Sequence, residues 1–321
     1  MTHHAADTAL DALAWVESPL QLLTAAEWAH RHRQRTGRST AVVYRILDPQ
    51  VVATAEALHR MAAPFVRFEP YLGIPWARLT TSRHWAIGDA FSGQFRAAAA
   101  VLPRPRRVTI VDDGAMVVHA MLALAGEVAY ARPDQFESRS KTLLGGLVAD
   151  RLRGLAHDGR VELFTSFPGA DAPASRAGIT VVRDEFTWLR EAARREQLPA
   201  VRLPHPRIAL GSARVIDALL PAERYLRWVR ELAEDAPLSY LPHRRETPAL
   251  LDAVGALPGV TVVRTGLPIE LVLASAREPL ELHTLASSAA TTLRLVLAGT
   301  GSVIRETAPS ALSAPRSRGV A

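Results

Sequence analysis

Residues 12–23 read Ala-Leu-Ala-Trp-Val-Glu-Ser-Pro-Leu-Gln-Leu-Leu, a short apolar run followed at once by the start of a helix. Residues 12–17 have the composition of a buried strand. Ser18 and Pro19 are typical of the N-cap and the first position of a helix, which we expect to run to about His30. A strand that turns directly into a helix is the unit of a parallel sheet with helical covers.

The same alternation continues to about Phe167 and resumes after a proline-rich stretch at 198–206. In the first half we expect strands at 40–46, 65–68, 84–88 and 108–112, and helices at 51–61 and 185–196. In the second half we expect strands at 207–211, 238–241, 260–263 and 280–283, and helices at 222–233, 247–257, 268–275 and from Ser287. The sequence therefore predicts an α/β protein with two Rossmann-like domains that face a central cleft, at 1–200 and 201–307, and a disordered tail at 308–321.

The composition supports two packed domains and excludes several kinds of site. Of the 321 residues, 48% are hydrophobic and 22% are charged, which is the balance of globular proteins rather than disordered ones. The absence of cysteine excludes disulfides, thiolate zinc sites, iron–sulfur clusters and cysteine nucleophiles. Neither a G-x-G-x-x-G pattern nor a Walker A sequence occurs, so NAD and P-loop chemistry have little support. The histidines lack a convergent carboxylate pattern, and no metal site is expected.

The net charge of +6 favours anionic partners. Nucleic acid is not expected, because no element combines basic and aromatic residues in a stripe. Arg31, Arg33, Arg35 and Arg38 come at the end of the first helix, where cations complement the helix dipole. The first residues lack the pattern of a signal peptide, so we expect a cytoplasmic protein, with the inner membrane face as a further peripheral contact.

Acidic residues follow the predicted strand at 108–112. The sequence Asp112-Asp113-Gly114 places two carboxylates at the end of this strand, with a glycine that permits a tight turn. The carboxyl ends of parallel strands open into the cleft, so one carboxylate can serve there as a general base. The alternative is that the pair only caps the next helix and shapes the turn.

Three other polar clusters also follow strands, in the second half of the chain. His243 and Arg244 come after the strand at 238–241 and could bind a phosphate. Gly211 and Ser212 follow the first strand of that half, where a glycine lets a nucleotide approach the backbone. Ser287 and Ser288 open a helix, a position suited to phosphate binding, although Ser287 could be only an N-cap.

Six motifs carry a resemblance when they are taken in order. They are Glu17-Ser-Pro-Leu-Gln-Leu-Leu23, Ile87-Gly-Asp89, Asp112-Asp-Gly114, Gly211-Ser212, Tyr240-Leu-Pro-His-Arg-Arg-Glu246 and Ser287-Ser288. Over about residues 12–305 the chain resembles the bacterial sialyltransferases and polysialyltransferases. The resemblance implies the GT-B arrangement and an inverting, metal-independent transfer of sialic acid, or a related nonulosonic acid, from a CMP-sugar to a hydroxyl of a glycan or glycolipid acceptor. It implies no cofactor other than this donor.

The resemblance also implies roles for individual residues. Asp112 or Asp113, with Asp112 preferred, corresponds to the general base, and His243 to the phosphate-contacting general acid. Arg244 stands where the family usually has proline, which indicates a divergent branch. The further assignments to donor binding are Gly211, Ser212, Arg244, Glu270, Ser287 and Ser288, and those to the rest of the cleft are Ser18, Gln21 and Gly114.

Two other classes of function stay open at this point. One is a GT-B glycosyltransferase or epimerase that uses a UDP-sugar. The other is a nucleotide-binding protein that has the fold but no catalytic activity.

Overall fold

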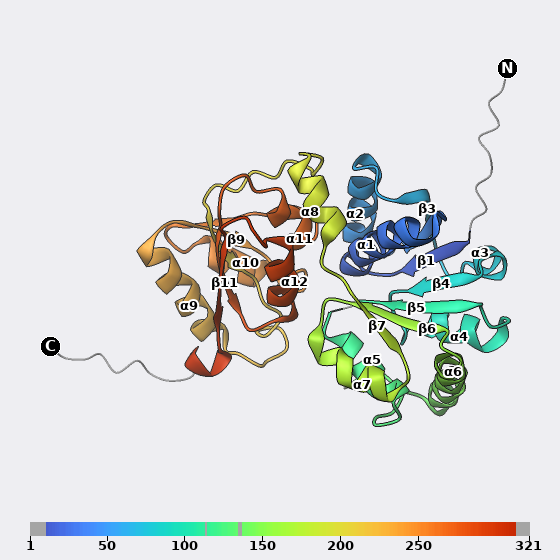
Figure 1. Cartoon of the computed structure of the whole chain (residues 1–321). Helices are drawn as coiled ribbons and strands as arrows, with labels where there is room; N and C mark the ends of the chain where they lie inside the picture. The colour runs from blue at the N-terminus through green and yellow to red at the C-terminus, as the bar shows by residue number, and fades with distance from the viewer. Residues whose placement is uncertain (1–10, 113, 134–136, 313–321) are drawn as a thin grey trace, which may run out of the picture. The chain divides into compact units, whose positions relative to one another are not determined.

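The computed structural model describes residues 11–112, 114–133 and 137–312, in which strands and helices alternate (Figure 1). Contacts divide the chain into two compact units. Unit 1 runs to Gln197 and includes Gly266–Pro268, and unit 2 comprises Leu198–Thr265 and the chain from Ile269 onward. Asp113 lies outside the described residues, as do 313–321 of the predicted tail.

Unit 1 is built around a seven-stranded parallel sheet. Its strands are β1 (Ala12–Val16), β2 (Thr40–Arg45), β3 (Phe65–Tyr71), β4 (His84–Ile87), β5 (Arg107–Val111), β6 (Val161–Thr165) and β7 (Thr180–Arg183). Its helices are α1 (Pro19–Thr36), α2 (Pro49–Arg60), α3 (Trp76–Thr81), α4 (Gly93–Val101), α5 (Met116–Leu124), α6 (Arg139–His157), the 3-10 turn η1 (Pro168–Ala170), α7 (Asp171–Arg176) and α8 (Thr187–Arg194). In Figure 1, α1 and α2 lie on one side of this sheet and α5, α6 and α7 on the other.

Unit 2 is built around a five-stranded parallel sheet. Its strands are β8 (Arg207–Leu210), β9 (Leu238–Leu241), β10 (Val260–Val262), β11 (Glu281–Leu285) and β12 (Val303–Thr307). Its helices are α9 (Ala222–Asp235), α10 (Pro248–Gly255), α11 (Ile269–Ala274), α12 (Ser288–Val296) and the 3-10 turn η2 (Pro309–Leu312).

Both sheets have the strand order of a doubly wound fold. The orders are β3-β2-β1-β4-β5-β6-β7 in unit 1 and β10-β9-β8-β11-β12 in unit 2. The direction of winding reverses between β1 and β4 in the first sheet and between β8 and β11 in the second. Ligands of such folds bind beyond the carboxyl ends of the strands at this reversal point. The topology therefore directs attention to the residues that follow β1, β4, β8 and β11.

The first strand–helix junction forms as the local sequence dictates. Every residue of β1 is buried, and Ser18 caps α1 by accepting a hydrogen bond of 3.2 Å from the N–H of Gln21. Pro19 occupies the first turn, where its missing N–H costs nothing. α1 ends at Gly37, whose φ of 68° is left-handed and whose N–H donates to Arg33.

The predicted fold class, α/β with two Rossmann-like domains, is confirmed. α1 is longer than expected, ending at Thr36 rather than near His30. No bounds were predicted for the strands β6, β7 and β12 or for the helices α3, α4, α5, α6 and α7. Pro309–Leu312, in the segment expected to be disordered, form a 3-10 turn.

No helix among the described residues is long and apolar enough to cross a membrane.

Candidate functional site

Asp112 lies directly after β5 and is 1% exposed. Its Oδ2 accepts hydrogen bonds from the Thr165 hydroxyl at 2.9 Å and from the N–H and hydroxyl of Ser166 at 3.0 and 2.9 Å. These donors come from the end of the neighbouring strand β6 and not from α5. The carboxylate therefore joins the ends of two adjacent strands, which is a different role from the helix cap considered as the alternative. Gly114, two residues further on, has a φ of 68° and makes the expected tight turn.

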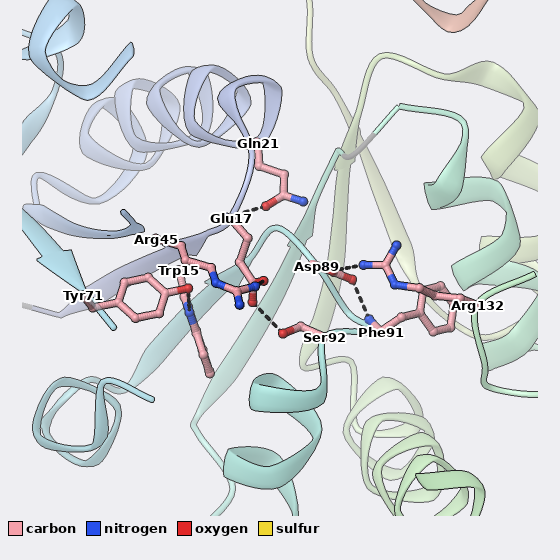
Figure 2. Close-up of polar contacts among 9 residues, drawn as sticks. All are labelled: Trp15, Glu17, Gln21, Arg45, Tyr71, Asp89, Phe91, Ser92 and Arg132. Carbon is pink, nitrogen blue, oxygen red and sulfur yellow. Dashed lines mark hydrogen bonds and ion pairs between the residues drawn. The ribbon is translucent and has the colours of Figure 1, made fainter. Parts of the chain in front are cut away.

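The reversal point of the unit 1 sheet is occupied by two carboxylates that are paired with arginines (Figure 2). Glu17, after β1, accepts from Arg45 Nη1 at 2.9 Å and from the Ser92 hydroxyl at 2.5 Å. Asp89, after β4, is paired with Arg132 and accepts from the N–H of Phe91 at 2.9 Å. The two pairs fix the loops that follow β1 and β4.

Ser18 and Gln21, which were predicted to line the cleft, both stabilise the turn between β1 and α1. Ser18 caps α1, and the Gln21 side chain, 2% exposed, accepts the N–H of Glu17 on Oε1 at 2.7 Å. Both side chains thus use an oxygen to hold the junction between β1 and α1. Any contact with a substrate would have to come from their remaining atoms, and it stays a prediction.

A pair of buried carboxylates lies deeper in unit 1. Glu27 on α1 accepts the N–H groups of Trp188 and Leu189 at 2.9 and 2.7 Å, so it caps the start of α8. Burial raises the pKa of Glu27 to about 7. Burial also raises the pKa of Asp184, which follows β7, and the negative charges of Glu27 and Asp112 raise it further. The pKa of Asp184 is therefore shifted in the same direction as that of Glu27, toward the protonated form.

In unit 2, the carboxylate of Glu246 organises the loops after β8 and β9. Its Oε1 accepts from the N–H of Ser212 at 3.1 Å and from the Tyr240 hydroxyl at 2.7 Å, and its Oε2 accepts from the N–H of His243 at 3.0 Å. Burial raises the pKa of Glu246, and these hydrogen bonds oppose that shift because they stabilise the carboxylate. One buried side chain thus holds two loops at the carboxyl edge of the sheet.

Gly211 is required at the end of β8 because the next loop comes very close. A Cβ built on Gly211 would lie 2.2 Å from the backbone N of His243 and 2.6 Å from Glu246 Oε2. A backbone atom cannot move aside as the end of a flexible side chain can. The glycine therefore serves the packing of the two loops, whereas the sequence suggested an approach of the backbone to a nucleotide.

The ring of His243 is held in one orientation by its own loop. Its Nδ1 accepts the N–H of Arg245 at 3.2 Å, so in the neutral ring the proton is on Nε2. Burial lowers the pKa of His243, and the charges of Arg244 and Arg245 lower it further. Without a bound anion the ring is neutral at pH 7 and presents an N–H donor. Arg244 and Arg245 are both exposed, and Arg245 pairs with Asp217.

The loop after β11 completes this edge of the sheet. Ser287 stands at the N-cap position of α12 but makes no capping hydrogen bond within the helix, and both Ser287 and Ser288 are exposed. Arg214 Nη2 donates to the carbonyl of Ala286 at 3.1 Å, which links the loop after β8 to the loop after β11. The residues after β8, β9 and β11 thus form one connected edge of the sheet.

Glu270, also assigned to donor binding, lies on α11 and is 5% exposed. It accepts from the Thr292 hydroxyl of α12 at 2.8 Å, and burial raises its pKa. The structure therefore places Glu270 between two helices, where it positions α12.

No family model and no curated protein matches the sequence. The solved structures that resemble the fold include an epimerase and a sialyltransferase. A protein described as a UDP-N-acetylglucosamine 2-epimerase of Listeria monocytogenes is 14% identical, with a TM-score of 0.50 over 92% of this chain and 78% of that one. An α/β-galactoside α-2,3-sialyltransferase of the luminous marine bacterium Photobacterium phosphoreum is 11% identical, also with a TM-score of 0.50, over 92% of this chain and 90% of that one. At these identities the likeness establishes the fold, which is shared by both proteins.

Several residues that build these sites were not assigned a role from the sequence. Glu17, Asp89 and Glu246 all occur within the quoted motifs. Their partners Arg45, Arg132, Ser212 and Tyr240 belong to other elements. The signal that could have found the three acids is their position directly after parallel strands.

Proposed function

We propose that the protein is a glycosyltransferase of the sialyltransferase type, which transfers sialic acid or a related nonulosonic acid from a CMP-sugar to a glycan hydroxyl. The observation that carries the proposal is the preorganised edge of the unit 2 sheet. There the Glu246 carboxylate fixes the loops of Ser212 and His243, and the exposed start of α12 adds hydroxyl and N–H donors. Donors held in place before the ligand arrives are what stabilise a departing phosphate.

His243 is the proposed general acid. A bound phosphate would raise the pKa of this histidine, opposing the effects of burial and of Arg244 and Arg245. The protonated ring then donates from Nε2 to the single phosphate of departing CMP. Arg244, Ser287 and Ser288 are the proposed additional contacts to that phosphate. A monophosphate leaving group needs fewer cations than a diphosphate, which fits a transfer without a metal.

Asp112 is the proposed general base, which removes the proton from the acceptor hydroxyl. Its Oδ2 is held by Thr165 and Ser166, which fixes the orientation of the carboxylate, and a general base has to be positioned in this way. The proposal requires Asp112 and His243 to act on opposite sides of one donor sugar, which makes the reaction an inverting displacement.

A UDP-sugar transferase or epimerase is the second candidate, because a protein described as an epimerase shares the fold with the same TM-score as the sialyltransferase. A thermal-shift panel with CMP, UMP, CDP and UDP separates the two candidates, because a ligand stabilises the protein that binds it. We expect CMP to raise the unfolding temperature most. A larger shift with UDP would replace our proposal with the second candidate.

The third class, a silent nucleotide-binding protein, is tested by donor breakdown. We expect CMP to be released from CMP-sialic acid in the presence of a glycan acceptor. Binding of CMP without any release of sugar would identify a protein that has the fold but not the activity.

A further inference from the structure

A pocket of about 670 Å³ lies at the amino edge of the unit 1 sheet, opposite the carboxyl ends of its strands. It is lined by residues at the amino ends of β1, β4 and β5 and by the second half of α1. A strand of five residues spans roughly 16 Å, so this pocket is well separated from Glu17, Asp89 and Asp112 at the carboxyl edge. Its volume is in the range of small-molecule binding sites.

The pocket carries a large excess of positive charge. Seven arginines but only two carboxylates, Asp11 and Glu162, line it. Both carboxylates are already paired, Asp11 with Arg38 at 2.7 Å and Glu162 with Arg35 at 3.6 Å. Within the described part of the chain, four of the guanidinium groups make no ion pair or hydrogen bond. They belong to Arg31, Arg83, Arg106 and Arg107.

The inner wall of the pocket also presents a buried polar atom without a partner. His32 is 8% exposed, and among the described residues its Nε2 has no hydrogen-bond partner. The ring stacks on Trp28 at 5.0 Å and meets His84 edge-on at 5.4 Å, so it is held in place. All three rings line the pocket. A buried polar atom without a partner is unfavourable, and a bound ligand would supply the partner that this nitrogen lacks among the described residues.

The helix dipole explains only part of this arrangement. Arg33 and Arg35 do stand in the last turn of α1, as that interpretation expects. However, Arg31 and Arg35 from α1 line one pocket together with Arg83 and Arg107, which come from the starts of other strands. Arginines that gather from separate segments repel one another, and the dipole of a single helix does not require this convergence.

We propose that this pocket binds a ligand that carries two or more phosphate groups, at a site separate from the donor site. The guanidinium group matches the oxygens of a phosphate with paired hydrogen bonds. Four unpaired cations favour a ligand with several negative charges, which two or more phosphates supply at neutral pH. The same chemistry occurs in soluble polyphosphorylated molecules and in lipid headgroups, and the experiment distinguishes these two sources.

The test is isothermal titration of the full chain with inorganic tripolyphosphate in the presence of saturating CMP. The double variant R83S/R107S removes two of the unpaired cations without touching a residue of the proposed catalytic edge. The matched control is R227S/R230S on α9, where both arginines are exposed and the loss of charge is the same. We expect binding at least about tenfold weaker in R83S/R107S and changed less than about twofold in the control, since hydrogen bonds to charged groups are strong.

His32→Phe is a second variant, which keeps the ring stack on Trp28 and removes the unpartnered nitrogen. We expect it to weaken tripolyphosphate binding while the unfolding temperature stays close to that of the wild type. Absence of saturable binding, or equal weakening in the two double variants, would overturn the proposal. Failure of CMP to bind would contradict the proposed function alone, because CMP tests the donor site and tripolyphosphate tests this pocket.

Vesicles identify the source of the phosphates. Phosphatidylcholine vesicles with and without cardiolipin, which has two phosphates, are sedimented with the wild type and both double variants. Binding that requires cardiolipin and is lost only in R83S/R107S would identify a lipid headgroup. Tripolyphosphate binding without vesicle binding would identify a soluble ligand. Vesicle binding that both double variants weaken equally would contradict a role for the pocket.

Discussion

His243 has the surroundings that the proposed general acid needs. The N–H of Arg245 occupies Nδ1, and burial keeps the ring neutral until an anion arrives. The proton that the proposed mechanism needs is therefore taken up together with the phosphate. We expect CMP to bind more tightly as the pH falls from 8 to 6, because the bound state favours the protonated ring.

Substitution of His243 tests this role. His243→Ala should reduce transfer by about 10²–10⁴-fold, the range of general acid–base catalysis, and should also weaken CMP binding. The measurement is the rate of CMP release from CMP-sialic acid with a saturating acceptor. Turnover at the wild-type rate in a folded His243→Ala protein would exclude the histidine from the mechanism.

Gly211→Ala tests the close approach of the two loops of unit 2. The new Cβ would lie 2.2 Å from the His243 backbone N, so the His243 loop must shift. We expect CMP binding to weaken about tenfold or more, with a loss of about 1–3 kcal/mol in stability, the usual cost of overpacking. Gly255→Ala is the control, because its Cβ would make only an ordinary contact with Val262 at 3.5 Å. Equal CMP affinities in the two variants would contradict the account of the β8–β9 edge.

At the scale of elements, α1 and α8 are joined by a buried carboxylate. Glu27 caps α8, and its pKa is raised from 4.5 to about 7. The folded state therefore holds this proton more tightly than the unfolded state does. The stability should fall as the pH rises from about 4.5 to 7 and should level off above that, by on the order of 3 kcal/mol for this group alone.

Glu27→Gln removes this titration. We expect the unfolding midpoint of the variant in denaturant to change less than that of the wild type between pH 5 and pH 7. The pH dependence of stability that remains in the variant comes from Asp184, whose pKa is also raised. Glu56→Gln, which changes an exposed carboxylate of α2, should leave the wild-type slope intact. If Glu27→Gln retained the full wild-type slope, the assignment of the proton to Glu27 would be wrong.

The elements that could be predicted are those whose signals are local. The junction of β1 and α1 follows from Ser18 and Pro19, and its capping bonds lie within three residues. The apolar pattern of α1 fades after His30, so the helix was predicted to end there, whereas its last turns carry polar and basic residues and Gly37 closes it. Two of the contacts of this last part come from other strands, His84 against His32 and Glu162 against Arg35.

The candidate sites depend even more on distant contacts. Glu246 could be recognised as part of a motif, but its partners Ser212 and Tyr240 come from a different strand end and from the strand itself. Asp112 could be placed at a strand end, whereas its donors Thr165 and Ser166 belong to a strand that was not predicted. Spacing along the chain contains no information about such pairs.

At the scale of the whole molecule, the proposal divides the reaction between the two units. Asp112→Asn should abolish transfer yet leave CMP affinity within about twofold of the wild type, because the donor phosphate is assigned to unit 2. CMP binding also reports that unit 2 is folded. Full transfer activity in Asp112→Asn would contradict the assignment of the base. A loss seen only in Asp113→Asn would move the base by one residue.

A crystal structure of the full chain with CMP tests the central claim most directly. We predict that the phosphate lies within hydrogen-bond distance, about 3 Å, of His243 Nε2 and next to Ser287 at the start of α12. CMP bound against unit 1, or bound to unit 2 with its phosphate away from His243, would contradict the proposed function.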